Sequence, residues 1–186
     1  MIKRKKIINK SKIQPWKEIS REQAFKKYSR VIDKIIFQLP DGSQTDFYIK
    51  AEAPAACMLA LTEDNEVILT NQYRPGPQKI LTELPGGMVD PNEDPEAAAK
   101  REFLEETGYI GDFKFIGTCL DCAYSTMERH CFVARNCKKI AEPINTQTEH
   151  TEVVLLSIPD FRKLLRLGQM TDVEVGYLGL DYLNLL

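Results

Sequence analysis

The sequence contains no apolar run that approaches the roughly 20 residues needed to span a membrane. Its start, MIKRKKIINKSKI, is basic but lacks the apolar block of a secretory signal peptide. We therefore expect no membrane association and a cytoplasmic location. The chain also lacks a large charge of either sign. Its formal net charge of −2 gives no electrostatic reason to expect nucleic-acid binding.

The sequence also lacks a complete cysteine framework. It has five cysteines, an odd number, and this together with the missing secretory signal argues for free thiols. Cys119 and Cys122 form a C-x-x-C pair, but no second pair is spaced suitably for a zinc site. A redox motif would need a helix here, whereas the surrounding residues predict a strand and then a loop. We expect a structural or incidental role for this pair.

With 186 residues, 43% hydrophobic and 28% charged, the chain has the composition of a globular protein of one domain with an N-terminal appendage. We predict a flexible basic arm over residues 1–15, a β segment over residues 16–50 and the main domain over residues 51–186. In the β segment, apolar residues alternate with polar ones on both sides of Pro40-Asp41-Gly42. This pattern predicts a β-hairpin.

The main domain is predicted to contain both strands and helices. Strands are expected over residues 55–61, 66–71, 80–84, 112–123, 128–137 and 151–158, and the first is apolar on both faces, as a central strand would be. One helix is expected to begin at Pro159-Asp160, with Asp160 as its cap, and a final helix to begin at Asp172 or Glu174. The order predicts a mixed sheet covered by helices, an α/β layered fold.

A further helix is predicted over residues 95–107. Asp94 is a good N-cap, and Pro95 fits the first turn because its missing N–H would be unpaired there. The three alanines at 97–99 propagate a helix well, and Gly108 can adopt the left-handed conformation that ends it.

Three glutamates of this helix share one face. Glu102, Glu105 and Glu106 stand at i, i+3 and i+4, where like charges repel. Clustered carboxylates either have raised pKa values or bind a hard divalent cation. The alternative is an acidic, solvated helix face. The neighbouring Gly86-Gly87 turn favours a binding site, because glycine lets the backbone approach a ligand closely.

The stretch from Gly87 to Tyr109 closely resembles the Nudix box, G-x5-E-x7-R-E-U-x-E-E-x-G-U, where U is apolar. The match consists of Gly87, Glu93, Arg101, Glu102, Phe103, Glu105, Glu106, Gly108 and Tyr109. The flanking segments QYRPG at 72–76 and ELPGG at 83–87, and the ending VEVGYLGLDYL, resemble the ADP-ribose and nucleotide-sugar pyrophosphatase branch of that family.

The resemblance implies an α/β/α sandwich with a mixed sheet, preceded by an N-terminal antiparallel sheet. It also implies a homodimer in which that N-terminal sheet is exchanged between subunits and shapes the partner's pocket. The expected activity is hydrolysis of the diphosphate of ADP-ribose or of a nucleoside diphosphate sugar, with Mg²⁺ or Mn²⁺. The products are a nucleoside monophosphate and a sugar phosphate.

Within the box, the resemblance makes Glu102 and Glu106 the principal metal ligands. Glu105 lies close to them, and the Gly86 carbonyl is a backbone ligand. Arg101 is expected to orient a box glutamate through a charge-assisted bond. Glu93 is expected to tie the loop to the helix.

Outside the box, Arg74 is the candidate for a phosphate or ribose contact, because its planar fork suits phosphate oxygens; the alternative is a surface arginine. Glu83 is a candidate for contact with substrate or with a metal-bound water. Trp16 either stacks on a nucleobase across the dimer or packs within its own segment. Branch members carry a glutamate that helps activate water in the loop after the box. Met127 stands at that position here, so either Glu128, one residue on, serves or the base comes from the box.

Two other functions fit parts of the sequence. A non-catalytic nucleotide-sugar sensor would keep the fold, but the complete set of box carboxylates argues against this loss of chemistry. Hydrolysis of nucleoside triphosphates or capped RNA would also use the box. The N-terminal sheet segment and the QYRPG stretch argue against triphosphates, and the net charge of −2 argues against RNA.

Overall fold

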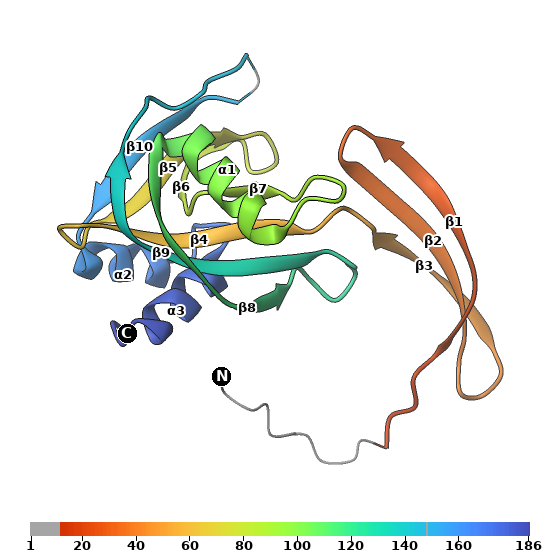
Figure 1. Cartoon of the computed structure of the whole chain (residues 1–186). Helices are drawn as coiled ribbons and strands as arrows, with labels where there is room; N and C mark the ends of the chain where they lie inside the picture. Colours follow the sequence, from red (N-terminus) through yellow and green to blue (C-terminus); the bar gives the residue numbers. More distant parts are fainter. Residues whose placement is uncertain (1–11, 148) are drawn as a thin grey trace. The chain divides into compact units, whose positions relative to one another are not determined.

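The computed structural model describes residues 12–147 and 149–186, which belong to two compact units. The first unit runs to Glu52 and includes Tyr124–Thr126, and the second comprises Ala53–Ala123 and Met127–Leu186 (Figure 1). Most of the basic arm predicted over residues 1–15 lies outside the described residues. No helix in the described ranges is long and apolar enough to cross a membrane.

The first unit contains an antiparallel sheet of β1 (Lys17–Lys27), β2 (Arg30–Gln38) and β3 (Gln44–Lys50), in that order. At the turn between β2 and β3, Gly42 has φ +87°, in the left-handed region that favours glycine. The predicted hairpin and N-terminal antiparallel sheet are therefore confirmed. All residues of β1 are exposed and most are polar, so hydrophobic alternation does not reveal this strand.

The second unit is built on a mixed sheet with the order β10-β5-β4-β9-β8, in which β6 also pairs with β5 and β7 with β4. Strands β4 and β9 are parallel, and the other pairs are antiparallel. The middle of β4 is buried, which confirms the predicted central strand. The strands are β4 (Ala55–Thr62), β5 (Val67–Arg74), β6 (Lys79–Glu83), β7 (Gly86–Met88), β8 (Tyr109–Leu120), β9 (Glu128–Lys139) and β10 (Thr151–Leu156).

Helices cover both faces of this sheet: α1 (Pro95–Thr107) on one face, and α2 (Ile158–Leu167) and α3 (Val173–Tyr182) on the other (Figure 1). The alternation of β4 separates two cores. Leu59 lies in the cluster that contains Phe161 of α2 and Leu180 of α3. The preceding residue, Met58, lies in the cluster that contains Phe103 of α1. The α/β/α sandwich is confirmed.

The start of α2 differs from the prediction. The N-cap is Ser157, whose hydroxyl accepts a hydrogen bond from the Asp160 N–H at 3.3 Å and donates to the Asp160 carboxylate at 2.7 Å. Asp160 is thus inside the first turn, and its assignment as the cap was wrong. A proline is tolerated at the first positions of a helix, so the cap precedes it. The final helix begins after Asp172, one of the two starts predicted.

Candidate active site

Helix α1 has the bounds and caps that the sequence predicts. The Asp94 side chain accepts hydrogen bonds from the backbone N–H groups of Glu96 at 2.9 Å and Ala97 at 3.3 Å. At the other end Gly108 has φ +74° and donates its N–H to the Leu104 carbonyl at 2.8 Å. These caps fix which residues of the helix face the sheet.

Two of the three glutamates on the shared face of α1 are removed from water. Glu106 is 6% exposed and accepts a hydrogen bond from the Gly86 N–H at 2.9 Å. Burial raises the pKa of Glu106 to about 8, and the negative charge of Glu102 adds to this rise. Burial also raises the pKa of Glu102, although Arg101 opposes it. The alternative of a solvated acidic helix face therefore does not apply to Glu102 and Glu106. The Glu105 side chain, in contrast, is 44% exposed.

At Gly86 and Gly87, strand β7 passes so close to its neighbours that a Cβ atom does not fit. A Cβ atom on Gly87 would lie 2.2–2.5 Å from the carboxylate atoms of Glu102. A Cβ atom on Gly86 would lie 2.3 Å from the carbonyl oxygen of Ala56 in β4. The two glycines therefore let the backbone of β7 and the carboxylates of α1 share one small region, as the turn predicts.

Arg101 connects the helix to the loop before it. Its Nε and Nη2 donate to the two oxygens of Glu93, both at 2.9 Å, and its Nη1 donates to Glu102 at 2.7 Å. Nη2 also donates to the Met88 carbonyl at 3.0 Å. The Arg101 guanidinium is the main cause that lowers the pKa of Glu93 to about 2, and the Asp90 N–H, which donates at 3.0 Å, adds to it. Arg101 thus orients Glu102, and Glu93 fastens the loop.

Arg74 is held by a buried carboxylate. At the end of β5 its Nε donates to Glu83 Oε2 at 2.5 Å. Glu83 is 1% exposed, and its other oxygen accepts the hydroxyl of Thr171, just before α3. The Arg74 side chain itself is 37% exposed, so part of the guanidinium remains accessible. Glu83 of β6 and Thr171 before α3 therefore fix the direction of the partly exposed Arg74 side chain.

The glycine turn, the glutamates and Arg101 coincide with a known family pattern. The NUDIX domain matches residues 51–172, more than half of the chain. The chain belongs to the Nudix family.

Relatives of this Nudix chain carry consistent names. It is 28% identical over 174 residues, 91% of its length, to an ADP-ribose pyrophosphatase of Bacillus subtilis (strain 168), of which 92% is covered. It is 41% identical over 66 residues to an ADP-sugar pyrophosphatase of Mus musculus, which is 34% of this chain and 30% of that protein. The predicted family and branch are confirmed.

The fold is also found among solved structures. A crystal structure of an ADP compounds hydrolase matches with a TM-score of 0.74, over 95% of this chain and 100% of that one. The sequence identity is 16%, so this likeness concerns the fold.

Glu128 and Trp16 were also predicted as site residues. Glu128 is exposed and is the first residue of β9, whereas Met127 is buried, with 7% of its surface exposed. Trp16 belongs to the first unit, where its ring lies 6.1 Å from that of Phe37 and 5.4 Å from that of Phe47. The structure therefore brings together the box residues with Gly86, and pairs Arg74 with Glu83.

The sequence did not identify Glu149 as a site residue. Its negative charge contributes to the raised pKa values of both Glu102 and Glu106. Gln72 Nε2 donates a hydrogen bond to Glu149 Oε1 at 3.5 Å. The loop that carries Glu149 is attached to α1, since Thr151 Oγ1 donates to the Glu106 carbonyl at 3.0 Å.

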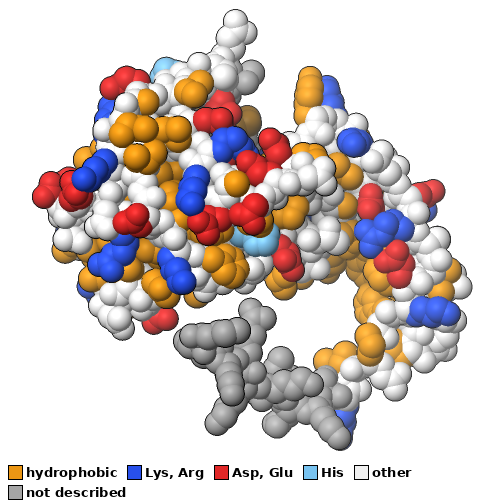
Figure 2. All heavy atoms as spheres, viewed as in Figure 1, with side chains coloured by type: hydrophobic (Ala, Val, Ile, Leu, Met, Phe, Trp, Pro, Cys, Tyr) orange, Lys and Arg blue, Asp and Glu red, His pale blue; other side chains and the backbone are white. Residues whose placement is uncertain are grey.

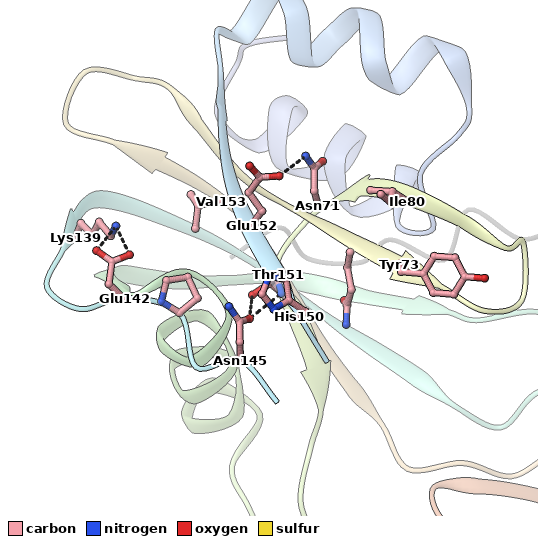
Figure 3. Close-up of a pocket in the computed structure, with 12 residues that line it drawn as sticks. Asn71, Tyr73, Ile80, Lys139, Glu142, Asn145, His150, Thr151, Glu152 and Val153 are labelled. Atoms are coloured by element: carbon pink, nitrogen blue, oxygen red, sulfur yellow. Dashed lines mark hydrogen bonds and ion pairs between the residues drawn. The ribbon is translucent and has the colours of Figure 1, made fainter. Parts of the chain in front are cut away.

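No local motif marks Glu149. The loop between β9 and β10 and the strand that follows contain two other glutamates, Glu142 and Glu152, in equally polar surroundings. Glu142 bonds to Lys139 at 2.8 Å and Glu152 to Asn71 at 3.4 Å (Figure 3). The antiparallel pairing of β10 with β5 is what places Glu149 beside the box, and that pairing is a tertiary feature.

A cleft of about 620 Å³ runs along β10 and the loop before it. Figure 3 shows Asn145 bonded to Thr151 in the middle of the cleft, with Lys139 and Glu142 on one side and Tyr73 and Ile80 on the other. The wall consists of Asn71, Gln72, Tyr73, Ile80, Lys139, Glu142, Pro143, Asn145, His150, Thr151, Glu152 and Val153.

Proposed function

We propose that this protein hydrolyses the diphosphate of ADP-ribose or of a nucleoside diphosphate sugar to a nucleoside monophosphate and a sugar phosphate. The observation that carries the proposal is the convergence of Glu102 and Glu106 on the Gly86-Gly87 backbone, with Glu106 buried. A diphosphate is itself an anion, so these carboxylates need a cation between them and the substrate. The family and the names of its relatives support this class of reaction.

The residues present fit a divalent cation such as Mg²⁺ or Mn²⁺. Glu102, Glu105, Glu106 and the Gly86 carbonyl offer oxygen donors only, which suits a hard cation. The missing Cβ atom of Gly87 lets the Glu102 carboxylate lie against the backbone of β7. Among the described residues, no three acidic, histidine or cysteine side chains are already gathered in ligating positions. In this structure Glu102 accepts a hydrogen bond from Arg101, and Glu106 accepts one from the Gly86 N–H. A bound cation would neutralise charge and lower the pKa of an attacking water.

We assign the water-activating carboxylate to Glu149 rather than to Glu128. The negative charge of Glu149 contributes to the raised pKa values of both Glu102 and Glu106, and Gln72 contacts this carboxylate at 3.5 Å. A base must lie within hydrogen-bond reach of the water, so the residue beside the carboxylates is the better candidate. Glu149→Gln is expected to lower kcat about 10³-fold, and Glu128→Gln less than about 10-fold. The reverse result would return the role to Glu128.

Arg74 is proposed to contact the substrate phosphates. Glu83 uses one oxygen for Arg74 and the other for Thr171, and it is almost fully buried. This favours Glu83 as the residue that positions Arg74 over a direct contact with substrate or water. Loss of Arg74 is expected to raise KM, because its fork binds phosphate in both ground and transition states.

The first unit is proposed to mediate a homodimer in which its sheet is exchanged between subunits. Support comes from the aromatic side chains gathered on it: Trp16, Phe37, Phe47 and Tyr124 form successive ring contacts of 5.4–6.1 Å. Trp16 remains 48% exposed, which leaves ring surface for a nucleobase. Light scattering after size exclusion tests the dimer, and a raised KM in Trp16→Ala tests the stacking.

A substrate panel scored by product identity tests the proposal as a whole. ADP-ribose, GDP-mannose, ADP-glucose, UDP-glucose, nucleoside triphosphates and capped RNA are each incubated with Mg²⁺ or Mn²⁺. Release of AMP from ADP-ribose is expected. Binding without turnover would instead indicate a sensor. On the face seen in Figure 2, lysine and arginine are interspersed with acidic residues, which does not favour RNA. The cytoplasmic location stays a prediction.

A further inference from the structure

Gln72 holds a buried acceptor atom without a donor. Within residues 12–147 and 149–186, its Oε1 is the buried side-chain oxygen or nitrogen that has no hydrogen-bond partner. The residue is 6% exposed and lies on the wall of the 620 Å³ cleft. An unsatisfied buried acceptor costs stability, so its presence calls for a ligand or a catalytic use.

The direction of the Gln72 amide follows from its neighbour. Nε2 donates to Glu149 Oε1 at 3.5 Å. Turning the amide over would place Oε1 against the carboxylate, and two acceptors repel. The orphaned oxygen is therefore Oε1, on the same amide whose nitrogen contacts the carboxylate that we assign as the base.

The other groups around Gln72 do not supply a proton. Its cross-strand partner in β10 is Thr151, whose hydroxyl is already donated to the Glu106 carbonyl. Two residues on, and on the same face of β5, Arg74 donates its Nε to Glu83, and it forms no hydrogen bond with Gln72 Oε1. Glu149 already accepts from the other end of the amide, Nε2, and is an acceptor when ionised. The missing donor must therefore come from a small molecule in the site.

We propose that Gln72 Oε1 and the Glu149 carboxylate together accept the two hydrogen atoms of the attacking water. This inference rests on the proposed function. The water oxygen forms a bond to one phosphorus while the bond from that phosphorus to the bridging oxygen breaks, and the bridging oxygen leaves on the other phosphate. Glu149 takes one proton of the water. The second proton stays on the new P–O–H group, hydrogen-bonded to Gln72, until solvent removes it.

A water satisfies this pair of acceptors better than a sugar hydroxyl. Water has two hydrogens, so it can bond to Oε1 and to Glu149 at once and keep a lone pair free for phosphorus. A hydroxyl has one hydrogen and would leave one acceptor unsatisfied. Gln72 is thus assigned as a catalytic residue that orients the nucleophile.

The test replaces Gln72 by a residue of similar size without polar atoms. We expect Gln72→Leu and Gln72→Met to lower kcat for ADP-ribose about 10²-fold with KM within about twofold. Their Tm values should not fall, because the orphaned acceptor is gone. The affinity for ADP-ribose with a methylene bridge, measured calorimetrically with Mg²⁺, should be unchanged. The matched control is Asn71→Ala, an amide one residue earlier on the opposite face of β5, with kcat within about threefold.

A double variant tests whether both residues act on one water. If they do, Gln72→Leu combined with Glu149→Gln loses little more kcat than Glu149→Gln alone. Independent, multiplicative losses would overturn the assignment. So would an unchanged kcat in Gln72→Leu, or a loss of folding in both Gln72 variants, which would show a structural role.

A crystal structure of the protein separates this inference from the proposed function. We expect a water within hydrogen-bond distance of both Gln72 Oε1 and Glu149, whichever substrate the enzyme takes. A protein group or sugar hydroxyl bonded to Oε1 would overturn the assignment. Failure of every substrate in the panel would overturn the proposed function, whether or not that water is seen.

Discussion

Replacing Glu106 by glutamine should stabilise the metal-free protein while removing its activity. Glutamine keeps an acceptor oxygen for the Gly86 N–H and removes a buried charge. The folded protein raises the pKa of Glu106 from 4.5 to about 8, so the native state binds its proton more tightly than the unfolded chain does. The contribution of Glu106 to stability is therefore most favourable below pH 4.5 and is lost as the pH rises toward 8.

The size of this effect follows from the two pKa values. At about 1.4 kcal/mol per pKa unit, the charged carboxylate costs up to about 5 kcal/mol above pH 8 and about 3 kcal/mol at pH 7. At pH 5 the cost is below about 1 kcal/mol. The Glu106→Gln variant should therefore gain stability over the wild type as the pH rises.

Urea denaturation in EDTA between pH 5 and pH 9 measures the difference in unfolding free energy between the two proteins. Glu96→Gln is the control, because Glu96 lies on the same helix, pairs with Lys100 at 2.7 Å and has a side chain that is 46% exposed. Its difference should stay within about 0.5 kcal/mol at every pH. Adding Mg²⁺ should stabilise the wild type and leave Glu106→Gln nearly unchanged. A Glu106→Gln difference that does not vary with pH would refute the reasoning.

Two further substitutions test the geometry around the box. Gly87→Ala should lower kcat by at least about 10²-fold, because the new Cβ atom forces the Glu102 carboxylate out of its position; activity within threefold of the wild type would contradict the close approach. Thr171→Val should lower the unfolding free energy by about 1–3 kcal/mol, since it leaves a buried Glu83 oxygen without a donor. The same variant should raise KM about 10-fold with little change in kcat, because Arg74 loses its support, and steady-state kinetics would expose a different pattern.

The sequence predicted those parts of the structure whose causes are local. The caps at Asp94 and Gly108 lie next to the helix that they bound, and the spacing of the box glutamates is a property of one helix. The start of α2 was misplaced because a serine hydroxyl and an aspartate compete as caps within four residues. Strand β1 was not visible as a pattern, since its polar residues are held by pairing with β2.

The remaining parts of the site depend on contacts between distant segments. Glu149 and Gln72 are 77 positions apart, and no motif connects them. Thr171 and Glu83 are 88 positions apart, and Thr171 stands just before α3, which packs against β4, β8 and β9. The spacing of residues in the sequence does not predict such contacts, because they follow from the order of strands in the sheet.

The close approach of Gly86 to Ala56 has a consequence for protein design. The 23 residues from Gly87 to Tyr109 form a continuous motif that one would wish to transplant into another scaffold. Yet the turn that presents the Gly86 N–H to Glu106 is held by pairing with β4, a strand some 30 positions earlier in the chain. A graft would therefore have to carry β4 and its small side chains with it, because the smallest transferable unit is this pair of packed segments.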